Sequence, residues 1–233
     1  MNAQPSPFVP FGPAHLAALT AVALVAVGVT TLVRARPSAT PWVRGGLILG
    51  IVGLVVFEVG MSVREGWFTW KTWLPLELCD AATVLAVLSL LVPRPALAEV
   101  LYFWSASGSV LAMLTPAIPG SFPRWDFVVF FGLHGLVLAA ALVLVFGLGL
   151  HPRPGAPRRV FLLTLGWTAF VAMMNVVLDT NFMFLRQKPP VTTLLDWLGP
   201  WPVYILSGAA LGFALFHFLA FPFRAEWRPD ARA

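Results

Sequence analysis

The sequence predicts an all-α, polytopic bundle of seven transmembrane helices, with the N-terminus outside and the C-terminus inside. Of the 233 residues, 59% are apolar and only 11% are charged, and the mean hydropathy is +0.84. An ordinary soluble domain is about one-quarter charged. A water-soluble core of this length cannot hide so much apolar surface, because a folded chain of this size still exposes roughly a quarter of it. A soluble enzyme, a disordered chain and a fibrous repeat are therefore excluded, and the single Cys excludes a disulfide scaffold.

Seven apolar runs are long enough to cross a bilayer, which takes about 20 residues in a helix. Segments of about 10 alternating residues, typical of transmembrane strands, do not occur. Pro and Gly in the short connections end the helices for steric reasons. Without a repeat or a long linker, residues 1–233 form a single transmembrane domain with helices over 15–33, 45–63, 74–92, 97–115, 127–150, 160–180 and 200–221.

The basic residues predict the orientation, because short cytoplasmic loops are enriched in Lys and Arg. With the N-terminus outside, the outer segments hold five basic residues, namely Arg64, Lys71, Arg124, Arg186 and Lys188. The inner segments hold ten: Arg34, Arg36, Arg44, Arg94, Arg153, Arg158, Arg159, Arg224, Arg228 and Arg232. The net charge of +5 is therefore interpreted as a topology signal, and no nucleic-acid partner is predicted.

Ionisable groups inside a bilayer are costly, so each one is a candidate for a functional role. Several lie at a similar depth, roughly 8–11 Å below the outer boundary at about 1.5 Å per residue. They predict a polar pocket among the second, third, fifth and sixth spans that opens to the outer face. The members of this layer are Glu58, Cys79, Asp80, His134 and Asn175, with Glu77 and Asp179 nearer the boundary.

Cys79 and His134 are the two members suited to covalent catalysis. Cys79 is the only thiol, and His134 is the only His well inside a span. A His can take the thiol proton, after which the thiolate attacks a carbonyl carbon and forms a thioester. Glu77 and Asp80 oppose thiolate formation unless they are paired or protonated, so this chemistry requires His134 close by.

Structural roles are open for the same residues. A buried Cys is often a small apolar filler, His134 can be an interior hydrogen-bonded His, and Glu77 can simply begin a helix. Glu58, Asp80 and Asp179 can pair with basic residues near the interface, and Asn175 can bridge helices. Zinc needs three or four ligands, and no H-E-x-x-H or C-x-x-C spacing occurs, so no metal or cofactor is predicted.

Five strings resemble the YwaF-type integral membrane protein family over residues 45–222. They are TWLPLELCD at 72–80, AEVLYFWSASGSVLAMLTP at 98–116, FFGLHG at 130–135, MNVVLDTNFMFLRQKPP at 174–190 and LDWLGPWPVYIL at 195–206. That family is related to a eukaryotic Cys/His transmembrane acyltransferase that builds polyunsaturated ether-linked phospholipids.

The resemblance implies a helical membrane enzyme in which Cys79 is the nucleophile and His134 its base. It implies an acyl chain taken from a phospholipid, held as a thioester and passed to a lysophospholipid, or to water in a hydrolase. The expected location is the plasma (inner) membrane of a bacterium. Arg186 and Lys188 are candidates for contact with the lipid head group, with ordinary interfacial charge as the alternative.

Two functions of other classes remain open from the sequence alone. The outer pocket also suits a seven-helix transporter or small-molecule receptor that uses Glu58 and Asp179 for its ligand. No Gly- or Pro-broken pair of helices or inverted repeat stands out to favour transport. A structural membrane subunit is the third possibility. The oligomeric state is not predicted.

Overall fold

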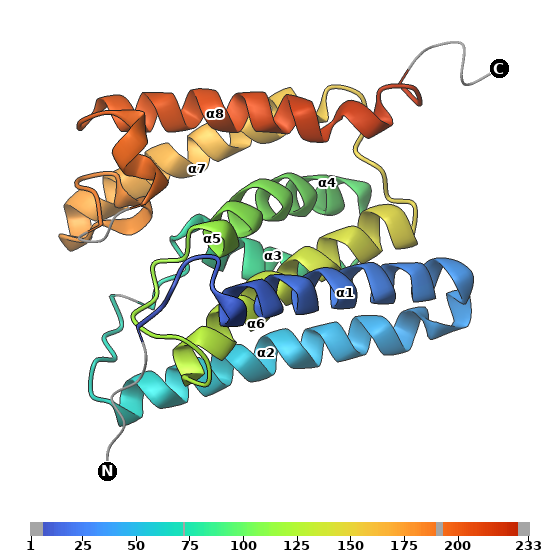
Figure 1. Ribbon diagram of the computed structural model, residues 1–233. Coiled ribbons are helices and arrows are strands. Elements are labelled where there is room, and N and C mark those ends of the chain that lie inside the picture. The colour runs from blue at the N-terminus through green and yellow to red at the C-terminus, as the bar shows by residue number, and fades with distance from the viewer. Residues whose placement is uncertain (1–6, 72, 190–192, 228–233) are drawn as a thin grey trace.

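The fold is all-helical, which confirms the predicted class (Figure 1). The computed structural model describes residues 7–71, 73–189 and 193–227, and every regular element in these ranges is a helix. Thr72, Pro190, Arg228 and Arg232, on which parts of the predictions rest, lie outside the described residues. The α-helices are α1 (Pro13–Ala35), α2 (Thr40–Arg64), α3 (Leu78–Leu91), α4 (Pro95–Trp104), α5 (Val110–Leu114), α6 (Trp125–Leu142), α7 (Ala156–Leu178) and α8 (Val203–Leu219).

Shorter helical turns extend or join these helices. Two π-helical turns, η2 (Ser105–Ser109) and η3 (Val143–Gly147), continue α4 into α5 and prolong α6. The remaining turns are 3₁₀: η1 (Pro37–Ala39), η4 (Phe182–Phe184), η5 (Leu194–Leu198) and η6 (Phe221–Phe223).

Within the described ranges, six helical stretches are long and apolar enough to cross a membrane. Their ends lie within four residues of those of six predicted spans, except that the second stretch begins eight residues earlier than predicted, at Pro37. Pro at N1 or N2 begins four of these helices. The six stretches are Pro13–Ala35, Pro37–Arg64, Pro95–Leu114, Trp125–Gly147, Ala156–Leu178 and Val203–Phe223.

The span predicted over 74–92 is shorter than expected. Its helix, α3, has 14 residues and begins at Leu78, so it is about 21 Å long against the roughly 30 Å of a hydrocarbon core. Pro75 disfavours a helical conformation at Leu74. Glu77 is still extended, at φ −63° and ψ 146°, when the helix starts. The consequence is that Cys79 lies in the first turn of α3.

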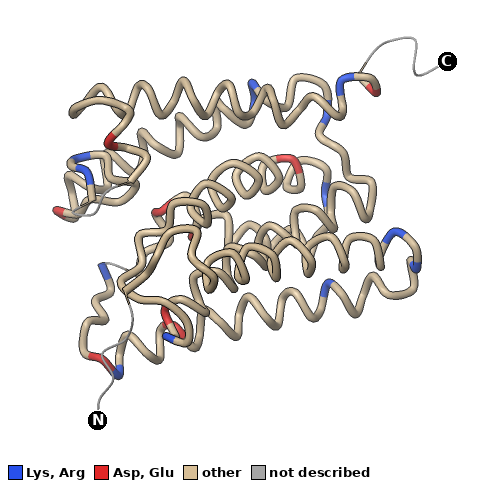
Figure 2. The backbone as a smooth tube through the Cα atoms, viewed as in Figure 1, with Lys and Arg blue, Asp and Glu red and all other residues tan. Residues whose placement is uncertain are grey.

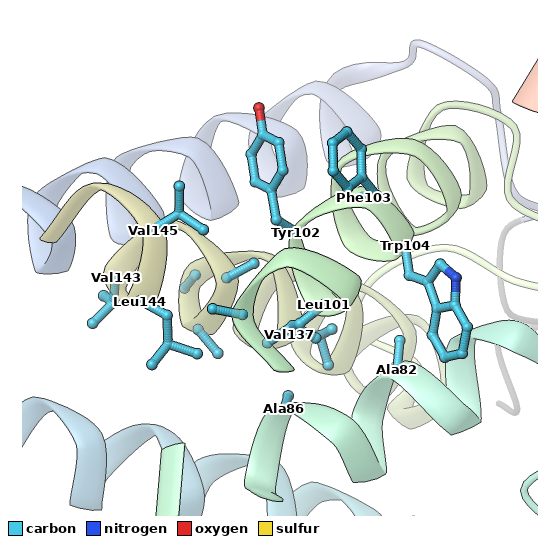
Figure 3. Packing of buried hydrophobic residues seen from close by; sticks show 14 of the residues in the cluster. Ala82, Ala86, Leu101, Tyr102, Phe103, Trp104, Val137, Val143, Leu144 and Val145 are labelled. Atoms are coloured by element: carbon cyan, nitrogen blue, oxygen red, sulfur yellow. The ribbon is translucent and has the colours of Figure 1, made fainter. Parts of the chain in front are cut away.

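The centre of the bundle is formed by the α4–η2–α5 stretch and by α6 with η3. In these two stretches 56% of the apolar window is buried within the protein, against 11–17% for α1, α2, α7 and α8. Figure 3 shows Leu101 of α4 and Val137 of α6 packed above the small side chains Ala82 and Ala86 of α3. Small residues let the helix backbones approach closely, which is how helices associate in lipid.

Glycines on α6 permit the closest helix approaches. A Cβ atom at Gly135 would lie 2.7 Å from Val22 of α1, and one at Gly132 would lie 2.8 Å from Leu54 of α2. Both glycines belong to the FFGLHG string. His134, which lies between them in the sequence, is therefore carried by a helix that packs closely against both α1 and α2.

The helices run back and forth between two ends of the bundle, and charge differs between these ends (Figure 2). The end at which α1 begins, here called the acidic end, holds seven of the described acidic residues and five of the basic ones. The opposite, basic end holds eight described basic residues and only two acidic ones, Glu99 and Glu226. The described basic residues are thus concentrated at one end of the bundle and the acidic residues at the other.

At the basic end, Glu99 ties α4 to the segment that leads into α7. Its side chain is only 3% exposed, and it accepts hydrogen bonds from Arg153 at 2.7 Å and Arg159 at 3.1 Å. The Arg153 backbone N–H donates to the same carboxylate at 3.2 Å. A buried carboxylate with several charged donors is a stable anchor, whereas one left without them is costly.

We expect Gly135→Ala to destabilise the bundle, because the added methyl group would overlap the stiff β-branched side chain of Val22. Overpacking of this kind costs about 1–3 kcal/mol. Gly53→Ala is the matched control, since nothing lies within 4 Å of a Cβ at that helical position. Thermal unfolding in detergent measures both. Equal melting temperatures for the two variants would contradict the close approach.

We expect Glu99→Gln to lower the free energy of unfolding by about 1–2 kcal/mol, because it removes charged hydrogen bonds whose arginine partners are half exposed and screened. Arg158→Ala serves as the control, since Arg158 is exposed and adjoins the network without joining it. Denaturation of both variants in the same detergent gives the comparison. If Arg158→Ala lowered the free energy of unfolding as much as Glu99→Gln, the result would argue against a specific role of Glu99 as an anchor.

Candidate functional site

A cavity of about 370 Å³ opens at the acidic end, between α2, α3, α6 and the junction of η2 with α5. Four residues of the predicted polar layer line it: Glu58, Cys79, Asp80 and His134. They come from three helices that are distant in the sequence. The cavity is thus the place where the structure brings predicted site residues together.

The start of α3 positions the thiol. Cys79 is half-buried in the first turn, and its backbone carbonyl accepts a hydrogen bond from the Thr83 hydroxyl at 2.9 Å. Asp80, the next residue, is exposed to the open cavity. The first turn of this short helix therefore contributes a thiol and a carboxyl group to the same cavity.

His134 is oriented by its own helix. Its Nδ1 lies 2.8 Å from the carbonyl oxygen of Phe130, one turn earlier. A carbonyl only accepts hydrogen bonds, so Nδ1 carries the proton and a neutral ring keeps its lone pair on Nε2. The Phe130 ring also packs against the imidazole, with centroids 4.3 Å apart. This arrangement leaves Nε2 as the ring atom available to accept a proton.

No hydrogen bond joins the Cys79 sulfur to the His134 ring in the described part of the chain. The two side chains line one cavity without direct contact of that kind. Catalytic hydrogen bonds in ligand-free enzymes are often long and tighten only when the substrate binds. The arrangement is therefore compatible with a base and a nucleophile that engage around a bound ester.

Ser109 is a cavity residue that sequence reasoning missed. It ends the π-helical turn η2, is only 2% exposed and lines the cavity, and its hydroxyl makes no hydrogen bond with the described residues. π-Helical turns within α-helices occur frequently at functional sites. The only sequence signal was the small, polar string Ser105-Ala-Ser-Gly-Ser109 in an apolar run.

Arg124 and Asp126 form an ion pair at the cavity wall, which the sequence analysis did not predict. The Arg124 guanidinium donates to both Asp126 carboxylate oxygens, at 2.9–3.2 Å. Gly120 makes this possible, since a Cβ there would lie 2.0 Å from Arg124 Cδ. The signal in the sequence was a lone basic residue one position before the helix that carries His134.

Aromatic rings border the cavity at the same end. Glu65 accepts hydrogen bonds from the indole N–H groups of Trp67, at 3.1 Å, and Trp125, at 2.9 Å, and these two rings stack with centroids 6.3 Å apart. Trp73 also stacks on Trp67, with ring centroids 6.4 Å apart. The rings connect the segment before α3 to the start of α6.

Two other predicted site residues, Asn175 and Glu77, have structural partners outside the cavity. Asn175 is fully buried, and its amide bonds the Phe182 backbone N–H and carbonyl and the Thr180 hydroxyl, so it shapes the turn after α7. Glu77 accepts the Met183 N–H at 2.9 Å. The expectation that the sixth span contributes to the polar pocket is therefore corrected, because Asn175 lies outside the cavity lining.

Asp179, Arg186 and Lys188 also lie outside the cavity lining. Arg186 donates to Asp179 at 2.7 Å, and this guanidinium holds the pKa of the Asp179 carboxyl below its usual range. Lys188 lies 3.5 Å from Asp196 and over the Tyr204 ring. Both cations proposed for head-group contact are thus already paired with carboxylates.

Within residues 7–71, 73–189 and 193–227, no group of three or more His, Cys, Asp or Glu side chains is arranged to hold a metal ion. Among the described residues, the lining groups that are not already hydrogen-bonded or ion-paired by their reactive atoms are the Cys79 thiol, the His134 Nε2, the Ser109 hydroxyl and the carboxyl groups of Glu58 and Asp80. That set suits acyl transfer through a covalent intermediate.

Comparison with known proteins adds one finding. No curated protein and no solved structure matches the chain. One family model does, over residues 10–220, so the matched region takes in the first helix as well as the strings around Cys79 and His134. The match covers most of the chain, and the protein therefore belongs to the TMEM164 family, a family of transmembrane proteins.

Proposed function

We propose that this protein is a membrane-embedded lipid acyltransferase, or an acyl hydrolase if water is the acceptor, and that it works through a thioester on Cys79. The observation that carries the proposal is that the only thiol of the chain lines the same cavity as His134, whose Nε2 is free to accept a proton. The relation to the eukaryotic Cys/His acyltransferase, implied by the resemblance, supports the same chemistry.

In the first half-reaction His134 Nε2 takes the Cys79 thiol proton, and the sulfur attacks the carbonyl carbon of a phospholipid ester. The negative oxygen of the tetrahedral intermediate accepts a hydrogen bond from Ser109, which is the hydroxyl of the lining without a partner. The ester C–O bond then breaks, the leaving alkoxide receives the proton from His134, and a lysophospholipid departs.

The second half-reaction reverses these roles. The hydroxyl of an acceptor lysophospholipid, or of water, gives its proton to His134 Nε2 and attacks the thioester. The C–S bond breaks and the proton returns to the Cys79 sulfur. Glu58 and Asp80 line the cavity as groups that orient the base or the acceptor hydroxyl. Arg124 is the candidate for contact with a lipid phosphate because it lines the cavity, whereas Arg186 and Lys188 do not; all three cations are paired with a carboxylate, Arg124 with Asp126.

The proposal includes a topology. We propose that α3 and the chain before it complete a seventh crossing, with the acidic end and the cavity outside and the basic end in the cytoplasm of a bacterium. The excess of basic residues at one end supports this orientation. The cavity then opens to the outer leaflet of the plasma membrane, where donor and acceptor lipids are present.

We expect purified wild-type protein incubated with a phospholipid that carries an alkyne-tagged acyl chain to acquire a hydroxylamine-labile acyl group, because hydroxylamine cleaves thioesters. Cys79→Ser should lose this label, and His134→Gln should slow its formation. Gel fluorescence after click coupling measures the label. Thr83→Ser, which keeps the hydroxyl bonded to the Cys79 carbonyl, is a control for damage to α3.

Equal labelling of wild type and Cys79→Ser would defeat the covalent mechanism. The transporter or receptor alternative makes a different prediction for the same variants. It requires Cys79→Ala to retain ligand-dependent binding or uptake, whereas Glu58→Gln loses it.

We expect Ser109→Ala to slow thioester formation by about 100-fold, the lower end of the effect of losing one oxyanion donor. Binding of the donor lipid should change little, because the hydroxyl acts on the transition state. Ser105→Ala is the matched control, since Ser105 belongs to the same π-helical turn and is buried, but bonds only the Tyr102 carbonyl at 3.4 Å. Single-turnover kinetics separate the two, and equal rates would remove Ser109 from the mechanism.

A further inference from the structure

An apolar groove of about 270 Å³ runs along the outside of the bundle between α2 and α3. Its walls carry Val52, Val55 and Val56 from α2 and Thr83, Val84 and Leu88 from α3, and no polar atom is exposed along it. Val56 is 65% exposed and Leu88 is 51% exposed. In a bilayer these side chains face the hydrocarbon region, so the groove is open to lipid along its length.

The groove and the polar cavity both adjoin an intermediate space, and each shares lining residues with it. A further cavity, also of about 270 Å³, shares Glu58, Asp80 and Thr83 with the polar cavity. The same intermediate cavity shares Val55, Thr83 and Val84 with the groove. Thr83, one turn after Cys79 on α3, lines all three. Both inner cavities expose polar groups, whereas the groove beyond them is wholly apolar.

This contrast matches the polarity of one class of molecule. A fatty acyl ester has a polar carbonyl at one end and a purely apolar chain at the other. With the carbonyl beside Cys79, the chain has a path past Thr83 and Val84 towards Leu88. The path from Asp80 to Leu88 is about 12 Å long at 1.5 Å per residue.

We propose that the groove between α2 and α3 holds the acyl chain of a membrane glycerolipid, which enters sideways from the bilayer with its ester carbonyl in the polar cavity. This inference rests on the proposed function for the identity of the reacting bond. It goes further in assigning a lateral route, a chain-binding surface and a residue, Leu88, at which the chain leaves the groove.

The groove is expected to align the chain and to contribute little affinity. Lipid tails are as apolar as these side chains, so a chain gains little by moving from the bilayer into the groove. What the groove supplies is packing along a defined path, which holds the ester at a fixed distance from the thiol. A bulky side chain that obstructs the groove should therefore alter which chain lengths react more than it alters the amount of lipid bound.

The test uses full-length protein in phosphatidylcholine vesicles doped with a phosphatidylcholine that carries a diazirine midway along one acyl chain. Cys79→Ser prevents turnover, so photolysis and peptide mass spectrometry report where the chain lies. We expect cross-links concentrated on residues 51–58 and 83–88. Val84→Trp, which fills the groove next to Thr83, should abolish them. Val176→Trp on α7, where the native side chain is 76% exposed, is the control and should leave them unchanged.

A second measurement uses protein that retains Cys79 and identifies the acyl chains held there as thioesters. We expect Leu88→Trp to shift the acyl chains found on Cys79 towards shorter ones, and Leu24→Trp, at an exposed site of α1, to cause no shift. Mass spectrometry of the acylated peptide gives the chain lengths. The cross-linking pattern of the Cys79→Ser protein needs no substitution in the groove, so poor folding of a tryptophan variant leaves the test intact.

The outcomes separate the two proposals. Cross-links spread evenly over all lipid-facing helices, and unchanged by Val84→Trp, would overturn the groove even if wild type forms the thioester. Focused cross-links without any thioester on Cys79 would support the groove and remove the acyltransferase. Cross-links to a second copy of the chain across the groove would make it a subunit interface and overturn the inference.

Discussion

The close packing of α6 against α1 and α2 is the interaction on which the rest of the structure depends. Gly132 and Gly135 leave no room for a side chain at these contacts, since a Cβ at either would lie within 3 Å of Leu54 or Val22. In lipid, helices associate through such close van der Waals contact because no hydrophobic force drives them together. This close approach of α6 to its neighbours also positions two residues that line the cavity. Glu58 lies one turn after Leu54 on α2, and His134 lies between the two glycines on α6.

Short and irregular elements then open the cavity at one end of the bundle. A helix of full length over 74–92 would include Pro75, whereas the observed α3 begins at Leu78 and places Cys79, a lining residue of the cavity, in its first turn. The π-helical turn η2 ends at Ser109, which lines the same cavity. Non-helical or distorted backbone at membrane depth is tolerated where it lines a cavity. The departures from regular helix thus coincide with the proposed chemistry.

The two ends of the bundle use charge in different ways. At the basic end, Glu99 is enclosed by Arg153 and Arg159, so its charge serves as an anchor between helices. At the acidic end, Glu58 and Asp80 line an open cavity and form no ion pair with the described cations. A low-dielectric site makes each polar group there more consequential than it is in water. This contrast supports a functional role for the carboxyl groups in the cavity at the acidic end and a structural role for Glu99 at the basic end.

The sequence by itself determined the membrane-spanning helical class, the approximate bounds of six long helices and a layer of polar residues towards one end. These follow from apolar run length and from the cost of charge in lipid, both of which are local properties. Depth along a helix, however, does not specify the direction in which a side chain points around it. Only the tertiary structure decided that Glu58, Cys79, Asp80 and His134 share a cavity, that Asn175 serves the turn after α7, and that Ser109 joins the site. Helix rotation and partner choice arise from packing between segments distant in the chain, such as Gly135 against Val22, and a single sequence carries no local signal for them.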